Sequence, residues 1–178
     1  TKLRCTGENP EELKEKEAML MIVESMGETN PMLGLRGCRA GLMYPGLTEM
    51  QTRAMFEAAC NKAKEGFDVH PEVMIPLTSH INELHAERMK LEREAKKVME
   101  EKGVKVDYMF GTMIEIPRAA LTADEIAKSA DFFSFGTNDL TQMTFGISRD
   151  DAEGKFLLNF VERGLLPANP FQQLDWDG

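Results

Sequence analysis

The sequence predicts an α/β protein in which parallel strands alternate with helices, as in a partial TIM, or (β/α)8, barrel. Short apolar runs are separated by segments with helical spacing, which is typical of a parallel sheet. These runs lack period-2 alternation, as expected for strands that are covered on both faces. Polar side chains able to bind ligands follow several of the runs, as they do at the carboxyl-terminal face of a barrel.

The length and charge of the chain limit its architecture and its partners. With 178 residues it can form one domain with a sizeable core. A whole barrel typically needs roughly 250 residues, so we expect a helical lead-in over 1–29 and an incomplete barrel over 30–178. The formal charge of −9 argues against nucleic acid as a partner. No apolar run approaches the roughly 20 residues that span a bilayer, so we expect no membrane partner.

The elements predicted along the chain include four strand candidates. Residues 32–42 form a short extended segment that is punctuated by glycine. A capping-box pattern at 48–51 predicts a helix that runs to about Gly66. Further on we predict a strand at 73–77, an amphipathic helix at 79–102, a strand at 108–116, a short helix at 122–130, a strand at 132–135 and a helix that begins near Asp139.

Two carboxylates lie at the ends of successive strand candidates. Glu115 lies near the end of one strand, and Asp139 follows the next. Two such acids, one βα unit apart, can share a divalent cation. Mg²⁺ prefers one or two carboxylates and takes its other ligands from water and substrate, and it could stabilise an enolate or a transferring phosphoryl group. The alternative is that Glu115 pairs with Arg118 and Asp139 caps the following helix.

The segment between the strand and Asp139 is suited to an anion. Backbone N–H groups at a helix start, with the hydroxyl of Thr137 and the amide of Asn138, favour a carboxylate or a phosphate. Gly136 allows a ligand to approach the backbone closely. The alternative is an ordinary turn from strand to helix.

Arg36 is a third candidate for binding an anion. It lies between two glycines, and a guanidinium is the natural bidentate partner of a carboxylate or a phosphate. A surface salt bridge is the alternative for Arg36. Arg39 and Arg118 are expected to be structural.

The remaining reactive side chains point to no further chemistry. The three cysteines show no CxxC spacing, which predicts reduced thiols in an intracellular protein. The cytoplasm is the favoured compartment, and an organelle of the plastid or glycosome type stays open. None of the three histidines has a metal-ligand partner at helical spacing, so all three are expected to be structural.

Four long motifs, found in the same order, resemble the C-terminal phosphoenolpyruvate/pyruvate-binding domain of the pyruvate, phosphate dikinase family. They span 30–39, 71–77, 111–121 and 133–146, and the resemblance continues to about Asp177. Phosphoenolpyruvate synthase and the phosphotransferase-system enzyme I share the core at 138–142. The stretches 115–127 and 143–146 are more similar to the dikinase.

The resemblance implies a (β/α)8 barrel that binds phosphoenolpyruvate or pyruvate together with Mg²⁺. The family interconverts ATP, phosphate and pyruvate with AMP, pyrophosphate and phosphoenolpyruvate. A swivelling phosphohistidine domain carries the phosphoryl group between an ATP-grasp domain and the barrel, so both domains are implied partners. The residues implied at the site are Arg36 on the substrate phosphate or carboxylate, Glu115 and Asp139 on both substrate and Mg²⁺, and Gly136, Thr137 and Asn138 on the substrate.

The chain also departs from the family pattern. It holds no phosphohistidine motif and no ATP-grasp domain. A family arginine is expected upstream of Thr1 and the enolate-protonating cysteine beyond Gly178, so no complete catalytic set is present and we expect this chain alone to be inactive. Exposed barrel edges would be a liability, and a homodimer is a further expectation. A related phosphoenolpyruvate-utilising transferase and a non-catalytic phosphoenolpyruvate-binding module are the alternatives.

Overall fold

The structure, a computed structural model, describes residues 10–27 and 31–176. The chain divides into two compact units, with the division between Arg36 and Gly37. The first unit contains helix α2 (Pro10–Ser25), which has no buried residue, and the short 3-10 helix η1 (Pro31–Leu33). Helix α2 confirms the helical pattern predicted there. A domain boundary between 29 and 30 stays a prediction.

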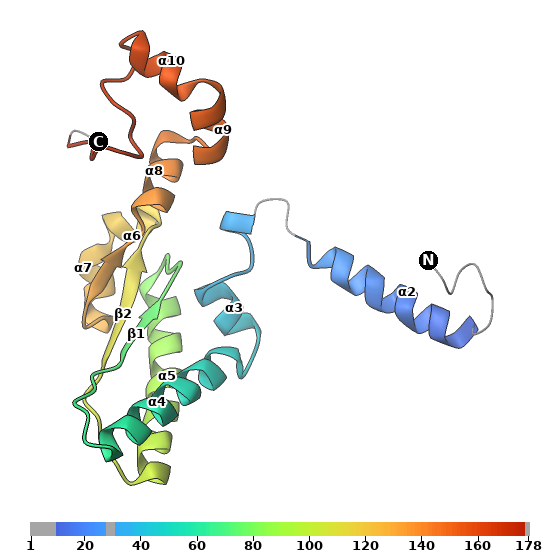
Figure 1. Cartoon of the computed structure of the whole chain (residues 1–178), viewed down its shortest axis with the longest axis vertical. Helices are drawn as coiled ribbons and strands as arrows, with labels where there is room; N and C mark the ends of the chain where they lie inside the picture. Colours follow the sequence, from blue (N-terminus) through green and yellow to red (C-terminus); the bar gives the residue numbers. More distant parts are fainter. Residues whose placement is uncertain (1–9, 28–30, 177–178) are drawn as a thin grey trace. The chain divides into compact units, whose positions relative to one another are not determined.

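The second unit is built on a parallel sheet of three strands (Figure 1). The strands are β1 (Glu72–Ile75), β2 (Met109–Ile114) and β3 (Phe133–Phe135), in the spatial order β1-β2-β3. All pairs are parallel, with Ile75 opposite Thr112 and Thr112 opposite Phe133. The α/β class with parallel strands is therefore confirmed. β2 and β3 lie within predicted apolar runs, and β1 begins one residue before the run predicted at 73–77.

Helices connect the strands, as parallel pairing requires. Helix α5 joins β1 to β2, and a group of short helices joins β2 to β3. The helices of this unit are α3 (Cys38–Met43), α4 (Leu47–Lys64), α5 (Ile81–Lys102), α6 (Pro117–Leu121), α7 (Ala123–Ile126), the 3-10 helix η2 (Ala127–Ser129), α8 (Thr137–Phe145), α9 (Arg149–Lys155) and α10 (Leu157–Glu162). Helix α5 ends as predicted at Gly103, whose left-handed conformation (φ 62°) suits glycine.

The main core lies between the sheet and helices α4 and α5. Helix α5 buries Leu84, Leu91 and Val98, which recur at the spacing of one helical face. Phe110 of β2 is buried against this face, and its ring meets Tyr108 edge-on at a centroid distance of 5.5 Å. Each such aliphatic or aromatic side chain contributes about 1.5–3 kcal/mol on full burial.

The extended segment predicted at 32–42 is wrong. Residues Pro31–Leu33 form a 3-10 helix and Cys38–Met43 form α3, so the described residues contain three strands and not four. Helix α3 is held by tertiary contacts: Cys38 is buried, and its backbone N–H donates to Pro76 O at 3.0 Å.

The predicted capping box at 48–51 is also wrong. Helix α4 begins at Leu47, and its N-cap residue is Gly46, two residues before Thr48. The Thr48 hydroxyl instead donates to the buried Glu87 carboxylate of α5 at 2.9 Å. Lys90, which is also in α5, lies 2.7 Å from the other Glu87 oxygen and 3.5 Å from Glu49 of α4, so the Thr48 hydroxyl and Lys90 both connect the two helices. The Thr48 side chain thus bonds to a residue of another helix and not to the first turn of its own helix.

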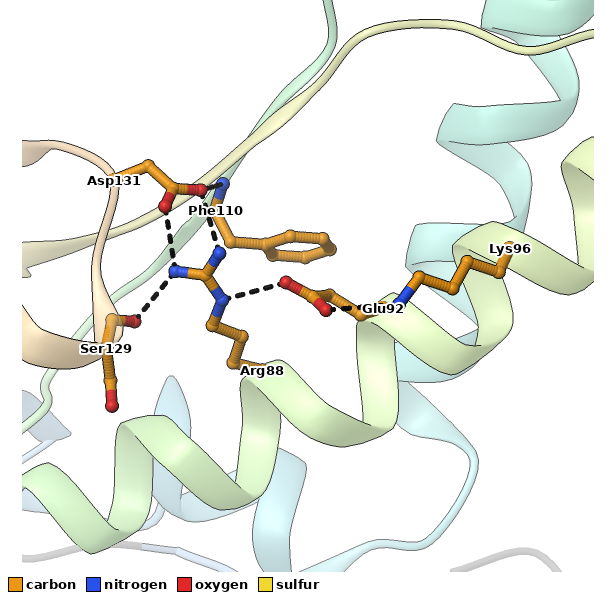
Figure 2. A network of polar contacts seen from close by, with 6 residues as sticks. All are labelled: Arg88, Glu92, Lys96, Phe110, Ser129 and Asp131. Carbon is orange, nitrogen blue, oxygen red and sulfur yellow. Dashed lines mark hydrogen bonds and ion pairs between the residues drawn. The ribbon is translucent and has the colours of Figure 1, made fainter.

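A polar network joins helix α5 to the chain just before β3 (Figure 2). Both terminal nitrogens of Arg88 donate to the Asp131 carboxylate at 3.0 Å, and Arg88 Nε donates to Glu92 at 2.8 Å. The backbone N–H of Phe110 donates to the same Asp131 carboxylate at 2.9 Å. Burial acts to raise the pKa of Asp131, but the Phe110 N–H and Arg88 outweigh it and hold this pKa below its usual value.

We expect Asp131→Ala to lower the free energy of unfolding by about 2 kcal/mol, because charge-assisted hydrogen bonds are lost. Since the folded pKa is lowered, the stabilisation is present above the pKa of an unfolded aspartate, about 3.9, and is lost as the pH falls through the folded value. Urea unfolding at neutral and strongly acidic pH measures this. The gap between wild type and variant should shrink in acid, whereas exposed Asp107→Ala should open no such gap. An equal gap at both pH values would contradict this role of Asp131.

Candidate functional site

Glu115 is a buried carboxylate at the ends of the three strands. It directly follows β2, its exposed fraction is 4%, and its Oε1 accepts a hydrogen bond of 2.6 Å from the backbone N–H of Leu77, which follows β1. The other oxygen faces the end of β3. A methyl carbon added at Gly136 would lie 2.6 Å from Glu115 Oε2.

Asp139 approaches the same point from helix α8. The same methyl carbon at Gly136 would lie 3.2 Å from Asp139 Oδ2. The two carboxylates therefore converge beside Gly136, and the missing side chain of this glycine leaves the space between them. Helix α8 starts at Thr137 with Gly136 as N-cap residue, so Asp139 lies in the first turn and is not the N-cap residue.

The donor set fits an oxygen-binding cation that takes few protein ligands. Among the residues that the structure describes, no group of three or more His, Cys, Asp or Glu side chains could hold a metal ion. Glu115 and Asp139 form a pair, and Mg²⁺ is commonly bound through one or two carboxylates, with water and substrate oxygens completing its shell. The role of the pair as metal ligands stays a prediction.

The first turn of α8 adds hydrogen-bond donors beside the carboxylates. Thr137 and Asn138 are exposed, and no side chain caps the helix. The first N–H groups of a helix have no intrahelical acceptor, so they favour an anion. The N–H of Gly136 is used differently, because it donates to Ile114 O at 3.1 Å and continues the pairing of β2 with β3. Carboxylates for a cation and N–H groups for an anion therefore lie side by side.

Arg149 is a neighbour of this site that sequence reasoning missed. Its Nη1 donates to Asn138 Oδ1 at 3.3 Å, and its backbone N–H donates to Gln142 Oε1 at 2.9 Å. A guanidinium only donates hydrogen bonds, so the Asn138 oxygen faces Arg149 and the amide N–H groups face elsewhere. No local sequence pattern connects two residues that lie on different helices.

The turn after β1 was missed as well. Leu77 has a φ of 58° and is the only non-glycine residue with positive φ in the described ranges 10–27 and 31–176. Thr112 Oγ1 of β2 lies 2.7 Å from Ile75 O and 2.9 Å from Thr78 Oγ1. Both threonines are fully buried. Buried hydroxyls in apolar runs were the only available signal, and nothing in the sequence pairs them.

Two arginines considered from the sequence have partners of their own. Arg36 belongs to the first unit, where its Nη1 donates to Pro31 O at 3.4 Å. Its predicted contact with substrate stays a prediction. Arg118 Nη1 donates to Ser79 O at 2.6 Å, which ties α6 to the chain before α5 and agrees with the expected structural role.

The two cysteines in the described part of the chain are buried free thiols with raised pKa values. Burial, together with the nearby carboxylates Glu83 and Glu87, raises the pKa of the Cys38 thiol to about 12. Burial also raises the pKa of Cys60, against the opposing effect of two lysines. Both are free thiols. Because the thiolate is the reactive form, these two residues are expected to be inert at neutral pH. Cys5 lies outside the described residues.

Comparison with known proteins identifies the family. Residues 8–172 match the family described as PEP-utilising enzyme, PEP-binding domain, where PEP is phosphoenolpyruvate. The chain belongs to this family. This PEP-binding domain is similar over most of its length to curated proteins from plants and from a protist.

Several of the similar proteins are named pyruvate, phosphate dikinase. The PEP-binding domain is 57% identical to the chloroplastic enzyme 1 of Arabidopsis thaliana over 93% of this chain and 17% of the relative. It is 54% identical to the chloroplastic enzyme 1 of Oryza sativa over 92% of this chain and 17% of that relative, and 53% identical to the Giardia intestinalis enzyme over 88% and 18%. The chain thus spans less than a fifth of the length of these relatives. The resemblance drawn from the four motifs is confirmed.

None of the helices in the described part of the chain is both long and apolar enough to cross a membrane.

Proposed function

We propose that this chain is the PEP/pyruvate-binding part of a pyruvate, phosphate dikinase and that it binds PEP or pyruvate together with Mg²⁺. The observation that carries the proposal is the convergence of Glu115 and Asp139 beside Gly136, at the first turn of α8. The whole enzyme would interconvert ATP, phosphate and pyruvate with AMP, pyrophosphate and PEP through a phosphohistidine. Identities of 53–57% to dikinases support this choice within the family.

The fold around the site would be part of a (β/α)8 barrel. The three-stranded parallel sheet supports this, and so does the position of Glu115 and Gly136 just beyond the carboxyl ends of β2 and β3, where barrel enzymes carry their active sites. The barrel domain would begin near residue 30, after a helical lead-in. In the whole enzyme its partners would be a phosphohistidine domain and an ATP-grasp domain, and a homodimer is also proposed.

One group of residues at the site would bind the cation, and another would bind the anionic substrate. Glu115 and Asp139 would hold Mg²⁺, which supplies positive charge to the enolate oxygen when it is bound. The N–H groups at the start of α8, with the Thr137 hydroxyl and the Asn138 amide, would orient the substrate carboxylate. Arg36 would neutralise the phosphate or the carboxylate of the substrate.

Calorimetry with oxalate and Mg²⁺ tests the proposal. Oxalate is a planar dicarboxylate that can chelate a metal ion as enolpyruvate would. We expect saturable binding by wild type and a loss of about 100-fold or more in affinity for Glu115→Ala, because a metal ligand contributes more than the 10- to 100-fold of its supporting groups. Glu125→Ala, an exposed carboxylate in α7, should bind as wild type does. Absence of binding by wild type, or unchanged binding by Glu115→Ala, would contradict the proposal.

The activity and the compartment of this chain remain proposals. We expect the 178 residues alone not to form PEP from ATP, phosphate and pyruvate, since they hold no phosphohistidine motif. Turnover by the pure chain in a coupled assay would refute this. The compartment would be intracellular, and the plant relatives named chloroplastic support an organelle as one possibility.

A further inference from the structure

We propose that Thr112 is a positioning residue for the Glu115 carboxylate and acts through the turn that follows β1. The inference rests on the proposed function, because Glu115 is taken as a ligand of Mg²⁺. Thr112 is not proposed as a ligand of the metal. Its hydroxyl holds the turn whose backbone N–H binds one oxygen of Glu115, and this leaves the other oxygen facing Asp139.

The first step is the hydrogen bonding of the Thr112 hydroxyl. A carbonyl only accepts hydrogen bonds, so the Thr112 hydroxyl donates to Ile75 O at 2.7 Å, and its oxygen lies 2.9 Å from the Thr78 hydroxyl oxygen, within hydrogen-bond distance. Ile75 is the last residue of β1, and Thr78 lies three residues further on, so one hydroxyl of β2 holds both ends of this turn. Both threonines have an exposed fraction of 0%, so water does not compete for these bonds.

The second step is the conformation of Leu77. A left-handed backbone is unfavourable for a side chain that is not glycine, and it persists only where the surroundings hold it. The Thr112–Thr78 pair provides one support. The other side of the turn is closed by α3, where Cys38 N–H donates to Pro76 O at 3.0 Å. In the resulting conformation the Leu77 N–H donates to Glu115 Oε1 at 2.6 Å.

The third step is the consequence for the metal position. With Oε1 bound by the backbone, Oε2 is the oxygen that lies beside Gly136, near Asp139 Oδ2. A carboxylate fixed in this way loses little freedom when it binds an ion, and such supporting hydrogen bonds commonly change metal affinity by 10- to 100-fold. The buried turn is therefore part of the site and does not serve stability alone.

The test compares variants that remove or keep the hydroxyl. Thr112→Val keeps the shape of the side chain and removes the donor, and Thr112→Ser keeps the donor. Thr52→Val removes the hydroxyl of a buried threonine in α4, which is not part of the turn. Mn²⁺ is the probe, and its dissociation constant is measured by electron paramagnetic resonance. The amide resonance of Leu77 is recorded in metal-free protein, because it reports the hydrogen bond to Glu115 directly.

We expect Thr112→Val to weaken Mn²⁺ binding by about 10- to 100-fold and to move the Leu77 amide proton upfield. Thr112→Ser should restore both readouts, and Thr52→Val should change neither, even if it lowers the melting temperature. If Thr112→Val does not fold, Thr78→Val carries the same test. Wild-type Mn²⁺ affinity in the valine variant would overturn the proposal, and so would an unchanged Leu77 resonance.

The same measurements separate this inference from the proposed function. If wild type binds no Mn²⁺, the proposed function fails, and the Leu77 resonance of metal-free Thr112→Val still decides whether the hydroxyl positions Glu115. If wild type binds Mn²⁺ and Glu115→Ala does not, but Thr112→Val binds normally, the proposed function stands and the positioning role is wrong.

Discussion

Gly136→Ala is expected to weaken the binding of Mg²⁺ and oxalate by about 100-fold or more, since the change would displace Glu115, the proposed metal ligand, and not merely a group that supports it. The new methyl carbon would lie 2.5 Å from Glu115 Cβ and 2.6 Å from Glu115 Oε2, distances at which atoms must move. Glu115 cannot yield without cost, because it is buried and its other oxygen is bound by Leu77. The backbone itself tolerates alanine, since the φ of Gly136 is −83°.

Calorimetry of the variant, together with its thermal unfolding, distinguishes a direct loss of ligand binding from a loss of folding stability. The Gly136 N–H that continues the sheet pairing remains in alanine. We therefore expect a small decrease in melting temperature beside a large decrease in affinity. Gly154→Ala is the matched control, because an added methyl carbon there meets no atom within 4 Å. Unchanged oxalate affinity in Gly136→Ala would show that the space beside this glycine is not used by the ligand.

Gly111→Ala is expected to give the largest loss of stability, about 3 kcal/mol in the free energy of unfolding, as overpacking of a tight interior does. Gly111 lies in β2, and an added methyl carbon would lie 2.5 Å from the backbone oxygen of Phe132 and 2.7 Å from its ring. That oxygen accepts the hydrogen bond from Thr112 N–H that begins the pairing of β2 with β3. Relief of the clash therefore requires the two strands to separate.

Urea unfolding measures this loss, with Gly154→Ala again as the control. In helix α9 the same substitution should be neutral or should stabilise by about 0.5–1 kcal/mol, because alanine loses less backbone entropy than glycine and meets no neighbour. The same glycine-to-alanine change is therefore expected to lower the free energy of unfolding at Gly111 and to leave it unchanged or raise it at Gly154. Equal stability of Gly111→Ala and wild type would mean that β2 and β3 are not paired in this register.

Elements fixed by local patterns were predicted well. The apolar runs around β1, β2 and β3 and the helical spacing of α5 depend on neighbours along the chain, so periodicity located them. Gly103 ended α5 for a local reason too, since glycine readily adopts the left-handed conformation that ends a helix.

Elements fixed by distant partners were predicted wrongly. The segment 32–42 reads as extended, but α3 is helical because Cys38 is buried and bound to Pro76. The Thr48 hydroxyl binds Glu87, 39 residues away, and so does not cap its own helix. A capping box is found instead at α5, where His80 is the N-cap residue and Glu83 accepts from its backbone N–H at 3.0 Å. Histidine is uncommon in this position, so the sequence pattern did not reveal it.

The candidate site likewise has some residues that the sequence could predict and others that it could not. Glu115, Gly136 and Asp139 lie at the ends of strands that the sequence located, so parallel pairing alone predicts that they come close together. The supports of the site could not be predicted, because Leu77 adopts a conformation that its residue type disfavours and Thr112 bonds across the sheet. Such features follow from packing and leave no periodic trace in the sequence.

The most direct test of the Mg²⁺ site is a crystal structure of this chain grown with Mn²⁺ and oxalate, with data collected at the manganese absorption edge. The proposed function predicts one strong anomalous peak beside Gly136, within about 2.2 Å of an oxygen of both Glu115 and Asp139, close to the distances of octahedral oxygen sites. Oxalate should lie against the first turn of α8. Bound oxalate with no peak between the two carboxylates, or a peak that contacts neither of them, would contradict the proposed site.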